Sequence, residues 1–141
     1  RVRPSSGPEE FPKGASRGPL TEKAYRAARA KCVRLSRKEG IDAAMRAHAL
    51  DALVAPTGNP AWPTDLVNGD HFTGGSSTPA AVAGYPSITV PMGFVAGLPV
   101  GLSFIGSAWS EGAMIRLAFA LEQAMPARRA PGFLATLPDG A

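Results

Sequence analysis

The sequence predicts an α/β fold whose core is a short helix followed by a β-hairpin. Two observations lead to this prediction. Residues 77–106 contain no charged side chain, so they should lie inside the protein. Patterns typical of amphipathic helices flank this uncharged stretch, at residues 21–38 and 111–125.

The first part of the uncharged stretch has the signals of a short buried helix. Thr78 is suited to cap a helix, Pro79 to occupy the first helical position, and Gly84 to end the helix after one or two turns. The rest predicts a hairpin. Residues 87–90 and 100–105 are β-branched or aromatic runs, and residues 94–99 form the turn between them, with Gly97 free to take a positive φ.

The N-terminal part predicts an irregular arm followed by two helices. Four prolines and no periodicity predict an arm over residues 1–19. Thr21 is expected to cap a helix over residues 21–38, and Gly40 to end it. Asp42 is expected to begin a second, shorter helix.

A strand and a long loop follow the helix pair. Residues 50–56 form an apolar run that ends at a proline, which predicts a strand buried on both faces. Residues 57–76 form a connection of about twenty residues, and ordered loops of that length are often functional. Its aromatic and hydrogen-bonding side chains favour a functional role.

After the hairpin, Ser110 is expected to cap a helix over residues 111–125, which Pro126 ends, and residues 127–141 are expected to form a tail packed at Phe133. The apolar side of this helix consists of Ala113, Met114, Leu117, Ala118, Leu121 and Ala124.

Composition and charge narrow the class of protein. The net charge of +4 combines +7 in residues 1–46 with −4 in residues 47–127 and +1 in residues 128–141. The basic side chains of residues 21–38 are spread around an amphipathic helix, so a solvated surface is expected rather than a nucleic-acid site. The single cysteine, Cys32, is expected to be buried and unreactive. No membrane span or secretory signal is recognised, and a cytoplasmic location is expected.

Asp70, His71, Ser76 and Ser77 contain the three partners of a serine-hydrolase relay. Residues crowded into one loop rarely hold a nucleophile, a base and an oxyanion hole in place. The preferred interpretation is therefore that Ser76, Ser77 and Thr78 cap the short helix and that Asp70 and His71 make turn or inter-segment hydrogen bonds. No metal-ligand spacing accompanies His48, and no metal or cofactor is expected.

The predicted elements do not form a complete domain. Three apolar strands and four helices, two of them short, leave sheet edges and faces uncovered. We therefore expect that the chain oligomerises or is a piece of a larger α/β protein.

Several segments together resemble the C-terminal part of the amidase signature family, and peptide-amidase-like members in particular. The segments that carry the resemblance are AGYPSITVPMG at residues 83–93, GLPVGL at 97–102, the helix at 111–123, LDALVAPT at 50–57 and GPLT at 18–21. The similarity covers roughly residues 10–133.

The resemblance implies a hydrolase of carboxamide C–N bonds, in which a Lys activates a Ser nucleophile through a second Ser on a cis peptide. Those residues belong to a glycine- and serine-rich core that precedes the matched region, so no catalytic residue is assigned here. The resemblance also implies that residues 20–126 are the C-terminal part of an α/β/α sandwich with a mixed β-sheet. The expected partners are a small amide substrate and either the missing N-terminal portion or a second copy, with no nucleic acid and no membrane.

The long loop is expected to form part of the wall of the substrate pocket. Its length and polarity, with the start of the short helix, suggest five substrate-binding residues: Thr57, Asn59, Trp62, Asp70 and Ser77. Two alternatives are a small interaction module that uses the basic helix and a miniature serine hydrolase that uses Ser76 or Ser77. Salt-sensitive binding to an acidic polymer would favour the first alternative, and labelling by a serine-reactive phosphonate would favour the second.

Overall fold

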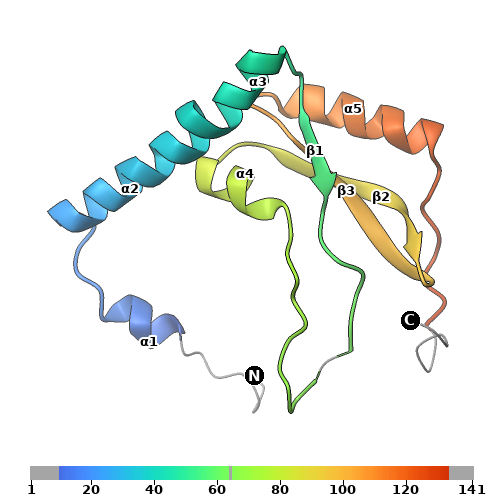
Figure 1. Ribbon diagram of the computed structural model, residues 1–141, viewed down its shortest axis with the longest axis horizontal. Coiled ribbons are helices and arrows are strands. Elements are labelled where there is room, and N and C mark those ends of the chain that lie inside the picture. The colour runs from blue at the N-terminus through green and yellow to red at the C-terminus, as the bar shows by residue number, and fades with distance from the viewer. Residues whose placement is uncertain (1–9, 64, 134–141) are drawn as a thin grey trace. The chain divides into compact units, whose positions relative to one another are not determined.

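The computed structural model describes residues 10–63 and 65–133 (Figure 1). The chain divides into two compact units, residues 1–32 and 33–141. In the first unit, α1 spans Glu10–Ala15. The prediction of an irregular arm is wrong over these six residues. Pro12 lies in the first turn, where a missing backbone N–H costs no helical hydrogen bond. Residues 1–9 of the predicted arm lie outside the described residues.

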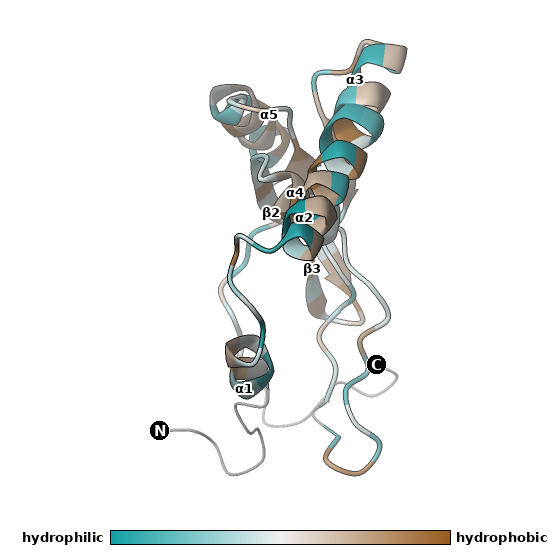
Figure 2. Cartoon of the chain, turned by 90° about the vertical axis from the view of Figure 1, so that its left-hand side faces the viewer, coloured by the Kyte–Doolittle hydropathy of each residue, from teal (hydrophilic) through white to brown (hydrophobic). Residues whose placement is uncertain are grey.

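Helix α2 spans Lys23–Ser36 and buries none of its residues. It begins two residues after Thr21, the predicted cap. Hydrophobic and hydrophilic residues are mixed along its surface (Figure 2). Apolar residues recur at three- and four-residue steps along α2 and form its apolar stripe: Tyr25, Ala28, Cys32 and Leu35. The Tyr25 and Leu35 side chains are 40% and 46% exposed. Cys32 of the same stripe is exposed too, so the prediction of a buried thiol is wrong. The stripe has the periodicity of a core-facing helix, yet these three side chains are exposed.

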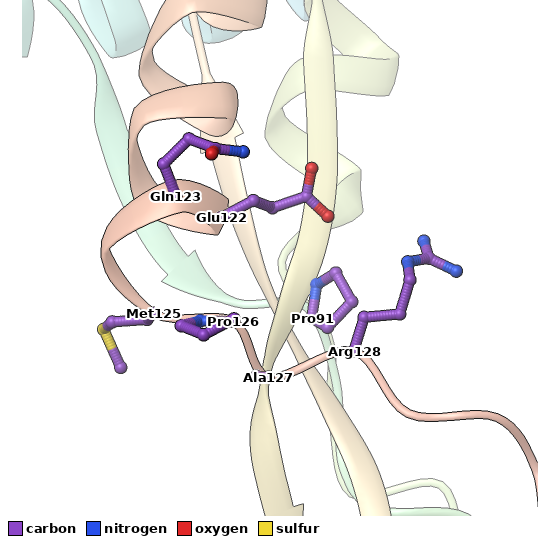
Figure 3. Close-up of a pocket in the computed structure, with 7 residues that line it drawn as sticks. All are labelled: Pro91, Glu122, Gln123, Met125, Pro126, Ala127 and Arg128. Carbon is purple, nitrogen blue, oxygen red and sulfur yellow. The ribbon is translucent and has the colours of Figure 1, made fainter.

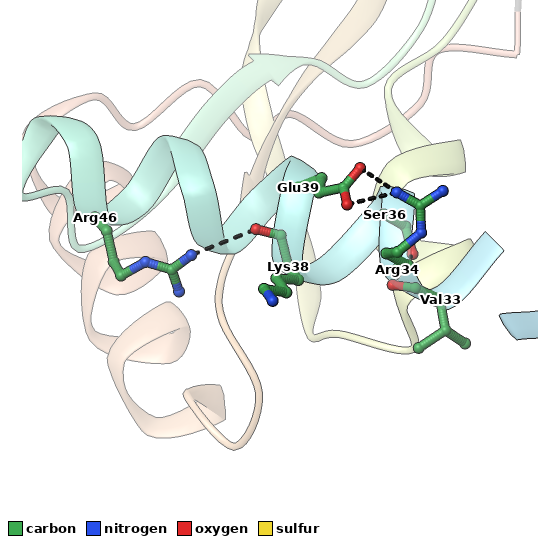
Figure 4. Close-up of polar contacts among 6 residues, drawn as sticks. All are labelled: Val33, Arg34, Ser36, Lys38, Glu39 and Arg46. Carbon is green, nitrogen blue, oxygen red and sulfur yellow. Dashed lines mark hydrogen bonds and ion pairs between the residues drawn. The ribbon is translucent and has the colours of Figure 1, made fainter. Parts of the chain in front are cut away.

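A π-helical turn, η1, spans Arg37–Ile41 and leads into α3, which spans Asp42–His48. Gly40 departs from helical geometry, with φ −107° and ψ −106°. The expected end of the helix at Gly40 is therefore a kink between two joined helices. Two contacts flank the kink in Figure 4. The Arg34 guanidinium donates to the Glu39 carboxylate, and the Arg46 guanidinium donates to the Lys38 carbonyl across 3.4 Å.

The sheet contains β1 (Leu53–Pro56), β2 (Ser87–Val95) and β3 (Leu98–Ile105), in the order β1-β3-β2. Both pairings are antiparallel. The predicted hairpin is confirmed as β2 and β3, but its turn is shorter than the predicted residues 94–99, because both strands extend into that range. Ala96 and Gly97 link the two strands with φ values of 49° and 78°, and a type I′ turn requires a positive φ at both positions.

Strand β1 is shorter than predicted and lies at an edge of the sheet. Its residues alternate between partly buried and exposed, and Val54 is 58% exposed. The prediction that this strand is buried on both faces is therefore wrong for the described chain. The apolar residues of β1 lie on faces of the sheet that the described elements cover only in part.

Helices pack against both faces of the sheet. Helix α5, Glu111–Ala124, lies on one face, where Met114 and Ala118 pack with Val90 and Phe104. The apolar side predicted for this helix is confirmed at Ala113, Met114, Leu117, Ala118 and Leu121. On the opposite face of the sheet, a second hydrophobic cluster packs Ile105 of β3 against α3 and α4. Helix α4 spans Ser77–Ala83.

The ends of α4 match the prediction in part. Gly84 ends the helix with φ 65°, as predicted. The helix begins earlier than predicted, so Ser76 occupies the cap position in place of Thr78, and its side chain makes no capping hydrogen bond. The predicted packing of the tail at Phe133 is wrong, because that side chain is 89% exposed. Residues 134–141 lie outside the described residues.

Candidate functional site

Three hydroxyl groups meet where β1 ends, on the sheet face opposite α5. Thr57 follows β1 and continues its pairing, because its N–H donates to the Gly101 carbonyl across 2.8 Å. The Oγ atom of Ser103 lies 2.9 Å from Thr57 Oγ1 and 2.9 Å from Thr89 Oγ1. The two threonine oxygens are 3.4 Å apart. Ser103 is only 4% exposed, whereas Thr89 is exposed. We call Thr57, Thr89 and Ser103 the hydroxyl cluster.

Gly101 makes this cluster possible. A Cβ atom at this position would lie 2.7 Å from Thr89 Cγ2 and 2.8 Å from Thr57 Oγ1, closer than real Cβ contacts come. Because the strand partners are Thr89↔Ser103 and Pro91↔Gly101, the glycine is the next residue of β3 on the same face. A side chain at Gly101 would push the threonines apart.

The two ends of the long loop meet beside the cluster. Gly58 and Gly75 form a bridge, and the Ser76 N–H donates to the Thr57 carbonyl across 3.2 Å. Asn59 holds the loop base when its side-chain amide is oriented so that both its nitrogen and its oxygen have partners: the nitrogen then donates to the Gly74 carbonyl at 3.0 Å and the oxygen accepts from the Thr73 N–H at 3.2 Å. A cavity of about 380 Å³ lies here. Its lining is Pro56, Gly58, Asn59, Thr73, Gly74, Gly75 and Ser76.

Ser76 is the unusual residue of this loop base. Its Oγ atom is buried and has no hydrogen-bond partner. A buried hydroxyl without a partner costs about 1–3 kcal/mol of desolvation. Ser76 also lines the cavity at the loop base.

A second group of polar residues lies farther along the loop. The Trp62 indole N–H donates to Asp70 Oδ1 across 2.5 Å, and the Trp62 ring is tilted against Phe72 with centroids 6.3 Å apart. Asp65 accepts the N–H groups of Val67 and Asn68. Hydrogen bonds from the Asn68 backbone, its side chain and the Val67 backbone lower the pKa of Asp65. A cavity of about 310 Å³ has Trp62, Asp65, Asp70 and His71 in its lining.

The structure thus divides the five predicted substrate-binding residues. Thr57 and Asn59 lie at the loop base, and Trp62 and Asp70 lie together in the second group. Ser77 is exposed and is the first residue of α4. Thr89, Ser103 and Gly101 were not predicted. Their signal in the sequence is the presence of small and hydroxyl residues in otherwise apolar strands.

A serine-hydrolase relay is not assembled in this loop. The Asp70 carboxylate accepts from Trp62, which confirms the predicted hydrogen-bonding role of Asp70 within the loop. Within residues 33–63 and 65–133, no serine hydroxyl is hydrogen-bonded to a His, Lys or carboxylate side chain.

Another cavity, of about 310 Å³, lies where α5 ends, and sequence analysis did not predict it. Pro91 of β2, Glu122 and Arg128 are among the residues that line this cavity. The Glu122 and Arg128 side chains extend to the side of α5 on which Pro91 lies (Figure 3). Arg129, from the segment after α5, stacks over the Phe94 ring at 4.2 Å. The segment that follows α5 is therefore tied to the hairpin.

Two features are absent from the described residues. No group of three or more His, Cys, Asp or Glu residues in that part of the chain is placed to hold a metal ion. None of its helices has the length and hydropathy that a membrane crossing requires.

This chain belongs to the amidase family, because the family profile, described as Amidase, matches residues 12–115. The predicted family is thereby confirmed. Among solved structures, the chain is similar to the native peptide amidase of Stenotrophomonas maltophilia, with a TM-score of 0.81 and 52% identity, covering 90% of this chain and 25% of that one. A peptide amidase in complex with the competitive inhibitor chymostatin gives a TM-score of 0.87 at 52% identity, covering 92% of this chain and 26% of that one.

Curated relatives match shorter stretches. A glutamyl-tRNA(Gln) amidotransferase subunit from Methanosarcina barkeri is 38% identical over 96 residues, which are 64% of this chain and 20% of the relative. A probable amidase of Arabidopsis thaliana is 47% identical over 60 residues, 42% of this chain and 12% of the relative. The chain therefore spans about a quarter of these peptide amidase structures and a fifth or less of these two relatives.

Proposed function

We propose that this chain is the C-terminal portion of a hydrolase of carboxamide C–N bonds, in which residues 20–126 supply sheet core and part of the wall of the substrate pocket. The observation that carries the proposal is the 52% identity to peptide amidases over 90% of this chain but only 25% of theirs. In this proposal the Ser, cis-Ser and Lys core lies in the remainder of the protein. The 141 residues alone are inactive.

The geometry of the sheet supports this proposal. Both outer strands, β1 and β2, have an edge without a partner strand in the described chain, and Val54 and Val95 are more than half exposed. Open strand edges beside apolar side chains are normally covered. In the proposed enzyme, the remaining portion extends this antiparallel sheet into the mixed sheet of an α/β/α sandwich.

The substrate wall is assigned to the loop and to the end of β1. Thr57 and Asn59 lie at the loop base, and Trp62 and Asp70 form the apolar and polar sides of the second group. Such a combination of an aromatic surface with a few placed polar groups is typical of small-molecule pockets. Ser77 remains a proposed contact at the start of α4.

The test is ammonia release from simple carboxamides such as benzamide. The protein at its native length and the isolated 141-residue chain are assayed side by side. We expect release by the native-length protein and none by the 141 residues. Release by the 141 residues at a comparable rate, or none by the native-length protein with any carboxamide tested, would overturn the proposal.

A further inference from the structure

We propose that the hydroxyl cluster of Thr57, Thr89 and Ser103 binds an uncharged carboxamide or peptide group of the substrate. This inference rests on the proposed function and names the part of the wall that recognises the amide. It starts from a change of polarity along β3. Ile105 packs in an apolar core, but Ser103, the next residue on the same face, begins the cluster.

The hydrogen-bonding capacity of the cluster is not used up internally. Each hydroxyl offers one proton and two lone pairs. The two contacts of 2.9 Å made by Ser103 Oγ use two of the three protons, and the third proton is within reach of the longer Thr57–Thr89 contact of 3.4 Å. Because an O–H···O contact of 3.4 Å is long and weak, that proton can turn to a further group, and several lone pairs also remain. Because Thr89 is exposed, such a group can reach the cluster.

The chemistry of the cluster favours an amide. Hydroxyls rotate, so a linked chain of them can present a donor at one end and an acceptor at the other. A carboxamide or peptide group carries one carbonyl acceptor and N–H donors, which complement such a chain. The strand residues on this face are all uncharged: Leu53, Ala55, Ser87, Thr89, Pro91, Gly101, Ser103 and Ile105. A charged ligand would therefore lose hydration without gaining a counter-ion.

Two neighbouring features support a ligand site here. Gly101 keeps the threonines together, since a Cβ atom would collide with both of them. Ser76, whose N–H is bonded to the Thr57 carbonyl, has a buried hydroxyl without a partner. An unsatisfied polar atom thus belongs to a residue that is hydrogen-bonded to Thr57 of the cluster.

The experiment measures the dissociation constant of benzamide by ligand-observed NMR in the native-length protein and its variants. Thr89→Val keeps the side-chain shape and removes the hydroxyl. Thr89→Ser keeps the hydroxyl. Ser87→Ala is the matched control, because Ser87 is an exposed hydroxyl residue on the same face of β2. Melting temperatures of all variants identify any that are unfolded.

We expect Thr89→Val to weaken benzamide binding about fivefold, as the loss of one neutral hydrogen bond does. Thr89→Ser and Ser87→Ala should bind as the wild type does. Benzoate, which has the same shape and a charge, should bind at least about tenfold more weakly than benzamide. An unchanged constant in folded Thr89→Val, equal binding of benzoate, or no benzamide binding by the wild type would overturn the inference. Retained binding without any hydrolysis would overturn the proposed function alone.

Discussion

The Arg37 side chain is hydrogen-bonded to the end of a helix that lies 46 residues further along the chain. Its Nε atom donates to the Ala83 carbonyl across 2.6 Å, and its guanidinium lies 5.3 Å from the centre of the Tyr85 ring. A carbonyl in the last turn of a helix lacks an intrahelical donor and carries partial negative charge, so a cation stabilises it. Arg37 therefore links η1 to α4, the helix that follows the candidate site.

Replacing Arg37 tests this link. We expect Arg37→Met to lower the free energy of unfolding by about 1 kcal/mol, because the side chain is exposed enough for solvent to screen much of the interaction. Urea denaturation of the native-length protein measures the change. Lys38→Met, the adjacent exposed position, is the control and should change stability by less than about 0.5 kcal/mol. Equal effects of the two substitutions would contradict the link.

Met114 is the largest fully buried side chain described, at 1% exposure, and it packs in the core beneath α5. Met114→Ala should therefore destabilise the chain by about 2–5 kcal/mol, through lost burial and the cavity that remains. Ile115, the next residue of the same helix, is 59% exposed. Thermal and urea unfolding of Met114→Ala and Ile115→Ala compare the two. Similar losses would show that α5 does not pack through the Met114 side.

Gly101 and Gly112 should respond to alanine in opposite directions. A methyl group at Gly101 meets the two threonines of the hydroxyl cluster, so Gly101→Ala should destabilise the chain by about 1–3 kcal/mol. A Cβ at Gly112 in α5 comes no closer than 3.7 Å to Arg116. Gly112→Ala should therefore stabilise the helix by up to about 1 kcal/mol. A stabilising Gly101→Ala, measured by urea denaturation, would contradict the crowding at the cluster.

Tyr85 provides a prediction about pH. Burial raises the pKa of its phenol above the ordinary value, aided by the hydrogen bond from the hydroxyl to Asp42 Oδ2 at 3.0 Å and by the Asp42 charge. The folded state thus holds the phenolic proton more tightly than the unfolded state does. The associated stability is fully present below pH 10 and is lost as the pH rises above it.

Tyr85→Phe isolates this effect. Between pH 9 and 11, the free energy of unfolding of the wild type should fall more steeply than that of Tyr85→Phe. Absorbance titration at about 295 nm should show a late-titrating phenol that the variant lacks. Identical pH dependence in the two proteins would contradict the environment assigned to Tyr85.

Trp62 is the aromatic surface of the proposed substrate wall. In the native-length protein, Trp62→Ala should raise KM for carboxamides about fivefold or change the order of preferred amides, because the ring is removed from beside Asp70. Leu66→Ala is the control from the same loop, since Leu66 is 83% exposed. Unchanged kinetics of Trp62→Ala across several amides would contradict the role of this residue.

Local signals predicted much of the fold. The order of helix pair, strand, long loop, short helix, hairpin and final helix agrees with the sequence prediction. Gly84 ends the short helix, as predicted, and Gly97 adopts the positive φ that its place in the turn predicted. These features succeed because helix termination at a glycine, turn formation and helical periodicity depend on residues that are close in the sequence. The predicted N-caps are less accurate, because neither Ser76 nor Ser110 makes a side-chain capping hydrogen bond.

Burial was predicted less well, because it depends on what covers each element. The apolar run of β1 and the stripe containing Cys32 have the patterns of buried segments, yet Val54 and Cys32 are exposed in the described chain. The hydroxyl cluster also escaped prediction. It joins residues 57, 89 and 103, and only the strand register brings them together.

The proposed function requires that the catalytic nucleophile lies outside these 141 residues. The most direct measurement is labelling of the active native-length protein with a serine-reactive phosphonate, followed by mass spectrometry of its peptides. We predict that the label lies on a serine outside residues 1–141 and that ammonia release stops as it is incorporated. Stoichiometric label on Ser76 or Ser77, removed by alanine at that position together with activity, would contradict the claim.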